Sequence, residues 1–265
     1  MTIGLLLACY NDIEFFDDCL KPWVELKEEL NIKIAISFGI FKQYKELGYI
    51  DDGRDASEHI IHKKYEDFLY IQNNYWYQKP EEFIYQTEIE LRNYSLNYLL
   101  KENCDYIKLI GIDEIYTKDQ IRDLVNYIKS NQSVCSFNIR MKNFVFDKNH
   151  YILDFCPVRV YKVNYIDWKL KGFHGDDEGY YENDLEEKSD YRRFPNIEIP
   201  NVLPKHFTWL DDERSRGKIL YQRLRWNGEN GCSFTYDKNN KLCFNEEYFK
   251  IYNKTKPEVF IINDE

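Results

Sequence analysis

An apolar run near the start of the chain constrains the fold more than any other feature of the sequence. Residues Ile3 to Cys9 are continuously apolar, and Tyr10, Asn11 and Asp12 follow them directly. A run without polar alternation is typical of a strand that is buried on both faces, as in a parallel sheet covered by helices. Open α/β sheets bind ligands at the carboxyl ends of such strands. The run therefore predicts an α/β fold with a polar site that begins at Tyr10.

The segments after this strand continue a β-α-β pattern. Residues 14–30 have the periodicity of an amphipathic helix, with a potential break at Pro22, and residues 33–38 are rich in β-formers. Residues 42–64 lose this periodicity and predict a long loop. The later elements are expected, in chain order, as a helix over 80–100, a buried strand over 106–110, a helix over 118–129, antiparallel strands within 134–163, an irregular acidic section over 168–204 and a basic helix over 211–226.

Charge and cysteine usage narrow the class of protein. Asp and Glu total 46 against 36 Lys and Arg, and the formal net charge of -10 disfavours non-specific binding to nucleic acids. The 7 Cys are scattered without a close pair, as expected for reduced thiols, and indicate neither a disulfide framework nor a zinc module. The apolar start is too short for a membrane span and lacks the features of a signal peptide. We therefore expect a cytoplasmic protein without a transmembrane segment.

Two adjacent acids follow the buried strand that is expected over residues 106–110. Asp113 and Glu114 come at its carboxyl end, where carboxylates can ligate a hard cation that in turn binds phosphate oxygens. Mg²⁺ or Mn²⁺ suits such a site. The alternative is that the two acids cap the helix that begins near Lys118, because anions are favoured at helix N-termini.

The spacing of three segments resembles that of the GT-A glycosyltransferases, of the family-2-like type. The segments are 91–96 (LRNYSL), 105–107 (DYI) and 111–114 (GIDE), and in that superfamily an Arg-Asn helix precedes a strand that ends in Asp-x-Asp. The resemblance implies a GT-A, Rossmann-like mixed central sheet flanked by helices. It also implies a single domain over 1–265, with a nucleotide-binding half (1–120) and an irregular acceptor half (121–265).

The resemblance also implies where the donor nucleotide and its metal ion bind. A nucleotide diphosphate sugar is expected beside Tyr10, Asn11, Asp12 and Arg92. The metal, Mn²⁺ or Mg²⁺, is expected at Asp113 and Glu114, and a histidine in the C-terminal part often completes the site, which points to His206. One departure is that Gly111 stands where the family has its first acid.

A catalytic base is expected within the acidic section. The segment 168–178 (WKLKGFHGDDE) resembles the acceptor-side motif of some of these enzymes, and a carboxylate there can deprotonate an acceptor hydroxyl. The candidates are Asp176 and Glu178 as base, and His174 as an orienting group or alternative base. A solvated acidic loop is the competing interpretation.

Cations for the departing diphosphate are expected after His206. Arg214, Lys218 and Arg225 are spaced so that they can share one face of a helix. Positive charge there would stabilise the negative charge that grows as the sugar leaves. A solvated basic face that balances the acidic section is the competing interpretation.

The leading functional hypothesis is transfer of a hexose from UDP-hexose to an acceptor hydroxyl on a glycan, a protein or modified DNA. One alternative is a non-catalytic nucleotide-binding or carbohydrate-binding module, which Gly111 would suit. Another follows from the abundance of Lys, Asn, Ile and Tyr, which is typical of AT-rich genomes such as those of phages, large viruses or low-GC bacteria. A phage enzyme in the host cytoplasm would glycosylate hydroxymethylated DNA bases, which must be flipped out of the duplex.

Overall fold

The fold was analysed in a computed structural model. The structure describes residues 1–9, 13–38, 70–73, 92, 95–163, 181–182, 188–189, 196–210, 215–219, 222 and 232–262. The chain forms two compact units, of which the first comprises Met1–Arg140 with Cys156–Pro204 and the second Met141–Phe155 with Lys205–Glu265. Residue 120, where the sequence suggested a division into halves, lies inside a helix of the first unit.

The first unit contains strands near the expected positions 3–9, 33–38 and 106–110 and the expected helix at 118, together with short strands that the sequence did not predict. Its elements are β1 (Ile3–Cys9), the 3-10 helix η1 (Ile13–Phe15), α1 (Phe16–Leu30), β2 (Ile32–Phe38), β3 (Tyr70–Asn73), β4 (Tyr106–Ile110), β5 (Glu114–Ile115), α5 (Lys118–Ser130), β6 (Ser136–Asn138), β9 (Val158–Lys162), β10 (Tyr181–Glu182), β11 (Lys188–Ser189) and β12 (Asn196–Glu198). Residues 92 and 95–101 are also helical. The expected strand bounds of β1 and β4 are confirmed, and α5 extends one residue beyond its expected end.

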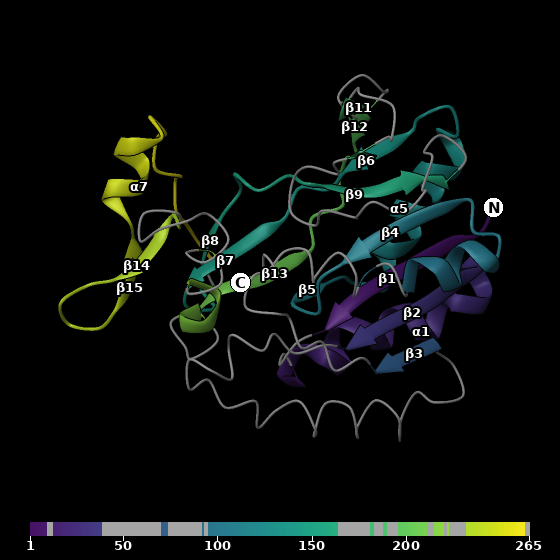
Figure 1. The fold of residues 1–265 in the computed structure, drawn as a ribbon, viewed down its shortest axis with the longest axis horizontal. Coiled ribbons are helices and arrows are strands. Elements are labelled where there is room, and N and C mark those ends of the chain that lie inside the picture. Colours follow the sequence, from purple (N-terminus) through teal and green to yellow (C-terminus); the bar gives the residue numbers. More distant parts are fainter. Residues whose placement is uncertain are drawn as a thin grey trace. The chain divides into compact units, whose positions relative to one another are not determined.

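A mixed sheet with the order β12-β6-β9-β4-β1-β2-β3 forms the centre of this unit (Figure 1). Strands β3, β2, β1 and β4 run parallel, whereas β9 is antiparallel to both β4 and β6. The chain builds outward from β1 through β2 to β3, and then returns to place β4 on the other side of β1. The α/β class and the mixed central sheet are therefore confirmed.

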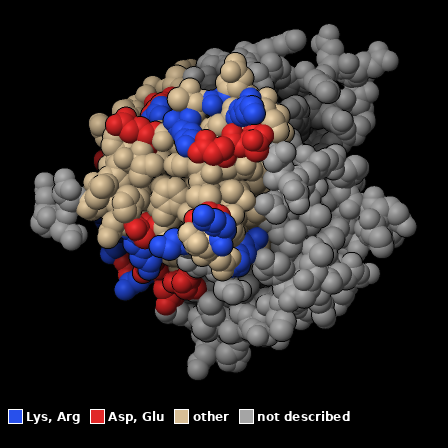
Figure 2. Space-filling model, turned by 90° about the vertical axis from the view of Figure 1, so that its left-hand side faces the viewer, with Lys and Arg blue, Asp and Glu red and all other residues tan. Residues whose placement is uncertain are grey.

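Charged side chains of both signs are mixed at the surface. On the face drawn in Figure 2, Lys and Arg lie next to Asp and Glu, with uncharged residues between these groups. Among the described residues on this face, neither sign forms an extended patch of its own, which gives no support to a polyanion-binding surface there. The DNA hypothesis places local positive charge at Arg192, Arg193 and the basic residues from Arg214 to Arg225. Of these, Arg192, Arg193, Arg214 and Arg225 lie outside the described residues, whereas Arg216 and Lys218 are described.

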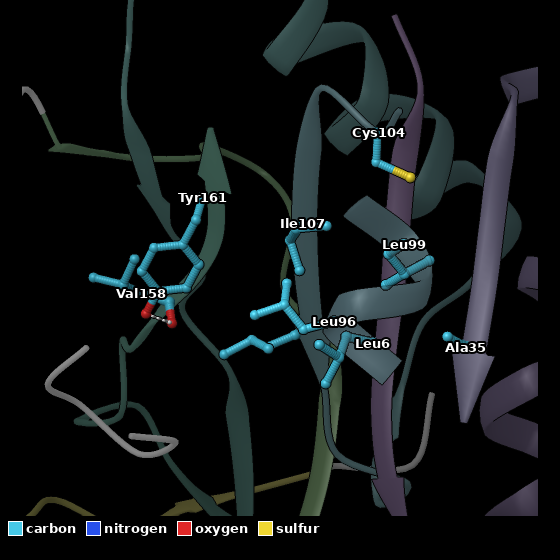
Figure 3. Packing of buried hydrophobic residues seen from close by; sticks show 9 residues of the cluster. Leu6, Ala35, Leu96, Leu99, Cys104, Ile107, Val158 and Tyr161 are labelled. Atoms are coloured by element: carbon cyan, nitrogen blue, oxygen red, sulfur yellow. Dashed lines mark hydrogen bonds between the residues drawn. The ribbon is translucent and has the colours of Figure 1, made fainter. Parts of the chain in front are cut away.

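The two faces of the sheet are covered by different helices. Leu6 of β1, Ile107 of β4 and Val158 of β9 belong to one apolar cluster with Leu96 and Leu99 of the helical segment 95–101 (Figure 3). Successive side chains of a strand point to opposite faces, so Leu5 and Leu7, which are fully buried, face away from this cluster. Both faces of β1 are thus buried, as its continuous apolar sequence predicts.

Gly4 allows this packing to be close. A Cβ at Gly4 would lie 3.0 Å from Sγ of Cys104, 3.0 Å from Cδ1 of Ile107 and 3.1 Å from Cδ1 of Leu99. The missing side chain therefore lets the helical segment 95–101 approach β1 directly, and a larger residue would overpack the cluster.

Helix α1 is continuous through Pro22, so this residue does not break the helix. The helix buries Cys19, Trp23 and Leu26 among other apolar residues and contacts α5, β2 and β5.

Helix α5 begins with a capping box: the Thr117 side chain accepts from the Gln120 amide, and the Gln120 side chain accepts from the Thr117 amide. The N-cap residue of α5 is therefore Thr117 rather than Asp113 or Glu114.

The second unit is a smaller β-rich assembly. Its elements are β7 (Lys142–Phe146), β8 (His150–Ile152), β13 (Lys205–Leu210), β14 (Phe234–Tyr236), β15 (Leu242–Phe244), α7 (Glu246–Ile251) and β16 (Phe260–Ile261). Strand β7 pairs with β13 in parallel and with β8 in antiparallel, and β14 and β15 form a hairpin. Its core includes Trp209, whose ring stacks on Phe234 with centroids 4.5 Å apart. Residues 215–219 and 222 are helical, within the expected basic helix.

Candidate functional site

The first candidate site lies where the strand order of the central sheet reverses. Strands β1 and β4 are parallel neighbours, with Leu7 paired to Ile110, and the chain continues from Ile110 into Gly111. Loops that leave the carboxyl ends of two strands on either side of such a reversal diverge, and ligands bind in the crevice between them. The turn 111–114 therefore begins at the position where the topology favours a ligand.

Gly111 and Asp113 share one small volume in this turn. The Glu114 amide donates to the Gly111 carbonyl at 3.0 Å, which closes the turn. Asp113 is 5% exposed, and a Cβ at Gly111 would lie only 2.7 Å from its Oδ1. The carboxylate of Asp113 thus occupies the space that a side chain at position 111 would need. The absence of an acid at this position and the placement of Asp113 depend on each other.

Glu114 is directed into the protein and is fully buried, at 0% exposure. Its Oε1 lies 3.0 Å from Nε of Arg159 and accepts from the Gly111 amide at 3.1 Å. Its Oε2 lies 3.5 Å from Nζ of Lys108 and accepts from the Tyr116 hydroxyl at 3.3 Å. Two hydrogen-bond donors and two positively charged side chains therefore surround the carboxylate that the sequence suggested as a second metal ligand.

Burial changes the acidity of the groups around Glu114. It lowers the pKa of Lys108 to about 8, although the attraction of Glu114 opposes this shift. Burial also raises the pKa of Tyr116 well above its usual value, and the nearby Glu114 carboxylate acts in the same direction. The Lys108 ammonium lies 5.0 Å from the centroid of the Tyr116 ring, within the range of a cation–π contact. The three side chains thus form one electrostatically coupled group.

Helix α1 holds the turn from another side. The Cys19 thiol donates to the Gly111 carbonyl at 3.6 Å, and Trp23 packs edge-to-face on Tyr116 with centroids 5.3 Å apart. The turn 111–114 and the following residues to Tyr116 therefore contact side chains from α1, β4 and β9. Such contacts from three elements leave the backbone of the turn little freedom to move.

The second candidate site, in the second unit, joins His206, Thr208 and Lys218. The Thr208 hydroxyl is hydrogen-bonded to Nε2 of His206 and accepts from Nζ of Lys218 at 3.4 Å. The tautomer of the imidazole sets whether the Thr208 hydroxyl donates to Nε2 or accepts from it. A metal ion at Nε2 would have to replace this hydrogen bond.

Aromatic rings frame this group. The ring of Phe155 stacks on the imidazole of His206 with centroids 5.4 Å apart, and Nζ of Lys218 lies 5.8 Å from the centroid of Trp209. These contacts restrict both the imidazole and the ammonium group. The arrangement orients the cation of Lys218, and its binding to a diphosphate stays a prediction.

The other expected site residues are distributed unevenly over the structure. Arg92 is helical and half-buried. Asp113 belongs to the first unit and His206 to the second, so their joint binding of one cation stays a prediction. The remaining expected residues lie outside the described part of the chain: Tyr10, Asn11, Asp12, His174, Asp176, Glu178, Arg214 and Arg225. Among the described residues, no group of three or more His, Cys, Asp or Glu is arranged to hold a metal ion.

Three residues of the first site were not singled out by the sequence. Lys108 stands in the middle of an otherwise apolar strand, and Arg159 lies in a similar strand that ends at Lys162. A charged residue in a buried strand needs a partner of opposite charge, so both positions carried a signal. Tyr116, between the acids and α5, carried none, because a buried tyrosine is common in a core.

None of the helices in the described ranges combines the length and the apolar character that a membrane span requires.

The protein is similar to several solved structures at low sequence identity. S. aureus TarS 1-349 matches with 14% identity and a TM-score of 0.39, over 61% of this chain and 47% of that one. The complex of the same fragment with UDP-GlcNAc matches with 14% identity and a TM-score of 0.40, over 61% and 45%. Glucosyl-3-phosphoglycerate synthase from Mycobacterium tuberculosis, in complex with Mn²⁺, UDP and phosphoglyceric acid, matches with 14% identity and a TM-score of 0.32, over 53% and 43%. The match thus covers less than half of each of those chains, and no family model and no curated protein matches the sequence.

Proposed function

We propose that this protein is a glycosyltransferase that moves a hexose from UDP-hexose to an acceptor hydroxyl. The observation that carries the proposal is the reversal of strand order at β1 and β4, with the turn that holds Asp113 directly after β4. Nucleotides bind at such reversals in open α/β sheets. The resemblance of segments 91–96 and 111–114 to the GT-A glycosyltransferases supports a nucleotide sugar as the ligand.

The residues at the turn fit a divalent cation that binds together with the donor. Mg²⁺ is usually held by one or two carboxylates plus substrate phosphates and water, and Mn²⁺ accepts similar ligands. Because both oxygens of Glu114 contact protein donors, we assign the carboxylate to Asp113 alone. When bound, the cation would neutralise charge on the departing diphosphate. A site with one protein carboxylate should bind the metal tightly only in the presence of the diphosphate.

The other groups of the reaction are assigned from the sequence and from the second unit. Lys218, oriented by Thr208, is proposed to bind the diphosphate as its negative charge grows. The base that deprotonates the acceptor is proposed within the acidic section, at Asp176 or Glu178 with His174 nearby. The nucleotide is proposed to bind beside Tyr10, Asn11, Asp12 and Arg92.

Isothermal titration calorimetry with UDP and UDP-glucose, each with and without Mn²⁺, tests the proposal directly. The wild type should bind UDP more tightly with Mn²⁺, and it should release UDP from UDP-glucose in the presence of an acceptor. Asp113→Asn should remove the effect of Mn²⁺. Asp119→Asn is the matched control, because this acid lies close in sequence but its side chain is 91% exposed on α5.

Three outcomes separate the hypotheses. Metal-supported binding with UDP release supports a glycosyltransferase. Binding without UDP release from any nucleotide sugar, in the presence of glycan, protein and hydroxymethylated DNA acceptors, indicates a non-catalytic binding module. Absence of binding to UDP and to other nucleoside diphosphates overturns the proposal.

A further inference from the structure

Protein groups surround both oxygens of the Glu114 carboxylate. Oε1 accepts a hydrogen bond from the amide of Gly111 at 3.1 Å, and Nε of the positively charged Arg159 lies 3.0 Å away in an ion pair. Oε2 accepts a hydrogen bond from the Tyr116 hydroxyl and forms an ion pair with Lys108. The contacts explain why a fully buried acid is retained next to Asp113 although it is not directed to a ligand.

The same contacts join the turn to the sheet. Gly111 donates its amide to the Glu114 side chain and accepts from the Glu114 amide, so two hydrogen bonds enclose the residues between them. One of the enclosed residues is Asp113. The Glu114 side chain is in turn bound to Lys108 of β4 and to Arg159 of β9. The backbone that carries Asp113 is therefore linked to two neighbouring strands.

Strand pairing delivers Arg159 to this position. The register of β9 against β4 pairs Val160 with Lys108, which places Arg159 one residue nearer to the carboxyl end of β4. A guanidinium group keeps its charge when it is buried, so Arg159 can hold the buried Glu114 carboxylate by an ion pair. Buried ion pairs contribute little net stability, because desolvation offsets their attraction. A role in geometry accounts for the network better than a role in stability.

We propose that Glu114 is a positioning residue that, held by Arg159, fixes the turn so that Asp113 is presented to the metal ion of the donor diphosphate. This inference rests on the proposed function and deepens it. Its consequence is that a change at Arg159 should weaken metal-supported nucleotide binding while binding without metal stays the same. A purely structural role would change both in parallel, together with the melting temperature.

The test compares three variants with the wild type. Arg159→Lys keeps the positive charge but loses the planar donor, and Tyr116→Phe removes only the hydroxyl that donates to Glu114, leaving its ring against Trp23. The control is Glu198→Gln, because Glu198 forms an exposed ion pair with Arg140, with nitrogen-oxygen distances of 2.8 Å and 2.8 Å, in the same unit. Measurements are the affinity for UDP with and without Mn²⁺, the melting temperature, and crystal structures of the variants.

We expect Arg159→Lys to weaken Mn²⁺-supported UDP binding by about 10-fold or more, as changes to outer partners of metal ligands do in metal sites. Tyr116→Phe should give a smaller loss in the same direction, and Glu198→Gln none. The affinity for UDP without metal should be unchanged in all three. If Arg159→Lys does not fold, Tyr116→Phe alone decides.

The inference is overturned if the folded Arg159→Lys and Tyr116→Phe variants bind UDP in the presence of Mn²⁺ as tightly as the wild type. Equal losses with and without metal would also overturn it. If wild-type protein binds no nucleoside diphosphate, the proposed function fails, and the crystal structures decide the inference separately. If Asp113 moves away from Gly111 in the Arg159→Lys structure while the melting temperature is unchanged, the result supports positioning by Glu114. If Asp113 does not move, the inference is rejected.

Discussion

Asp113 fills the space beside Gly111: a Cβ built at Gly111 would lie 2.7 Å from Oδ1 of Asp113 and 3.4 Å from Oε1 of Glu114. The two positions are therefore coupled, since a side chain at one displaces the carboxylate of the other. An acid at position 111 cannot be added to this arrangement without moving Asp113. In the proposed metal site, Gly111 therefore leaves room for the single carboxylate of Asp113.

Replacing Gly111 by Ala should impair metal-supported nucleotide binding with little effect on stability. The new methyl group meets the end of a flexible side chain, so Asp113 can move aside without disturbing the core. We expect a loss of about 10-fold in UDP affinity with Mn²⁺, of the size seen when supporting residues of metal sites are changed. Calorimetry measures this loss.

Gly4→Ala is the matched control for this prediction. At Gly4 the methyl group would meet Leu99, Cys104 and Ile107 in the core, which costs about 1 to 3 kcal/mol of stability in overpacked interiors. This variant should lower the free energy of unfolding and leave the nucleotide affinity of the folded protein intact. Loss of nucleotide affinity in Gly4→Ala together with loss of stability in Gly111→Ala would contradict the roles given to the two glycines.

Replacing Lys218 by Ala should lower kcat more than it weakens donor binding. A cation that meets charge developing in the transition state contributes little to the ground state, and loss of such a group costs about 10²- to 10³-fold in kcat. Thr208→Val should reduce kcat less strongly, because the ammonium group remains but loses an oriented partner. Steady-state kinetics with UDP-glucose gives both constants.

The control for Lys218 is Lys250→Ala, which removes an exposed lysine from α7 of the same unit. Its kcat should match that of the wild type. Parallel changes of kcat and donor affinity in Lys218→Ala would instead indicate ground-state anchoring of the diphosphate.

Removing the cap of α5 should destabilise the protein without affecting a ligand site. The Thr117 side chain accepts from the Gln120 amide at 3.2 Å, and loss of such a cap costs about 1 kcal/mol. Urea denaturation of Thr117→Ala measures this cost. Ser130→Ala, at the other end of the helix, should stay within about 0.5 kcal/mol of the wild type. Equal stability of the two variants would argue against the capping box.

Alkaline pH should destabilise the fold through the buried thiol of Cys104. Burial raises the pKa of this thiol from 9.0 to about 12, so the folded state keeps a proton that the unfolded state loses above pH 9. The contribution is fully present below pH 9, and the free energy of unfolding should fall by about 1.4 kcal/mol per pH unit as pH rises from 9 to 12. Tyr106, whose pKa burial raises to about 12, acts in the same direction.

Denaturation of wild type and Cys104→Ala between pH 8 and about 11 isolates the thiol, because Tyr106 titrates in both proteins. The variant starts from a lower stability, since it loses apolar contacts in the core, but its stability should fall less steeply above pH 9. Identical slopes would show that the thiol does not hold its proton in the folded state.

The sequence by itself determined the elements whose pattern is local. Strands β1 and β4 are continuous apolar runs, and α5 has helical periodicity, so their bounds followed from burial and from the helical repeat. Asp113 was a candidate for the same reason, because it lies in the turn that follows the buried strand β4. These features depend on residues that are neighbours in the chain.

The tertiary structure alone decided which side chains meet across the chain. A lysine in β4 and an arginine in β9 each signal that a buried partner exists, but only the antiparallel pairing of β9 with β4 brings Arg159 to Glu114. The pairing depends on many weak packing contacts over the whole sheet rather than on any local pattern. For that reason the sequence suggested Glu114 as a metal ligand, whereas the fold surrounds its carboxylate with two hydrogen-bond donors and two positively charged side chains.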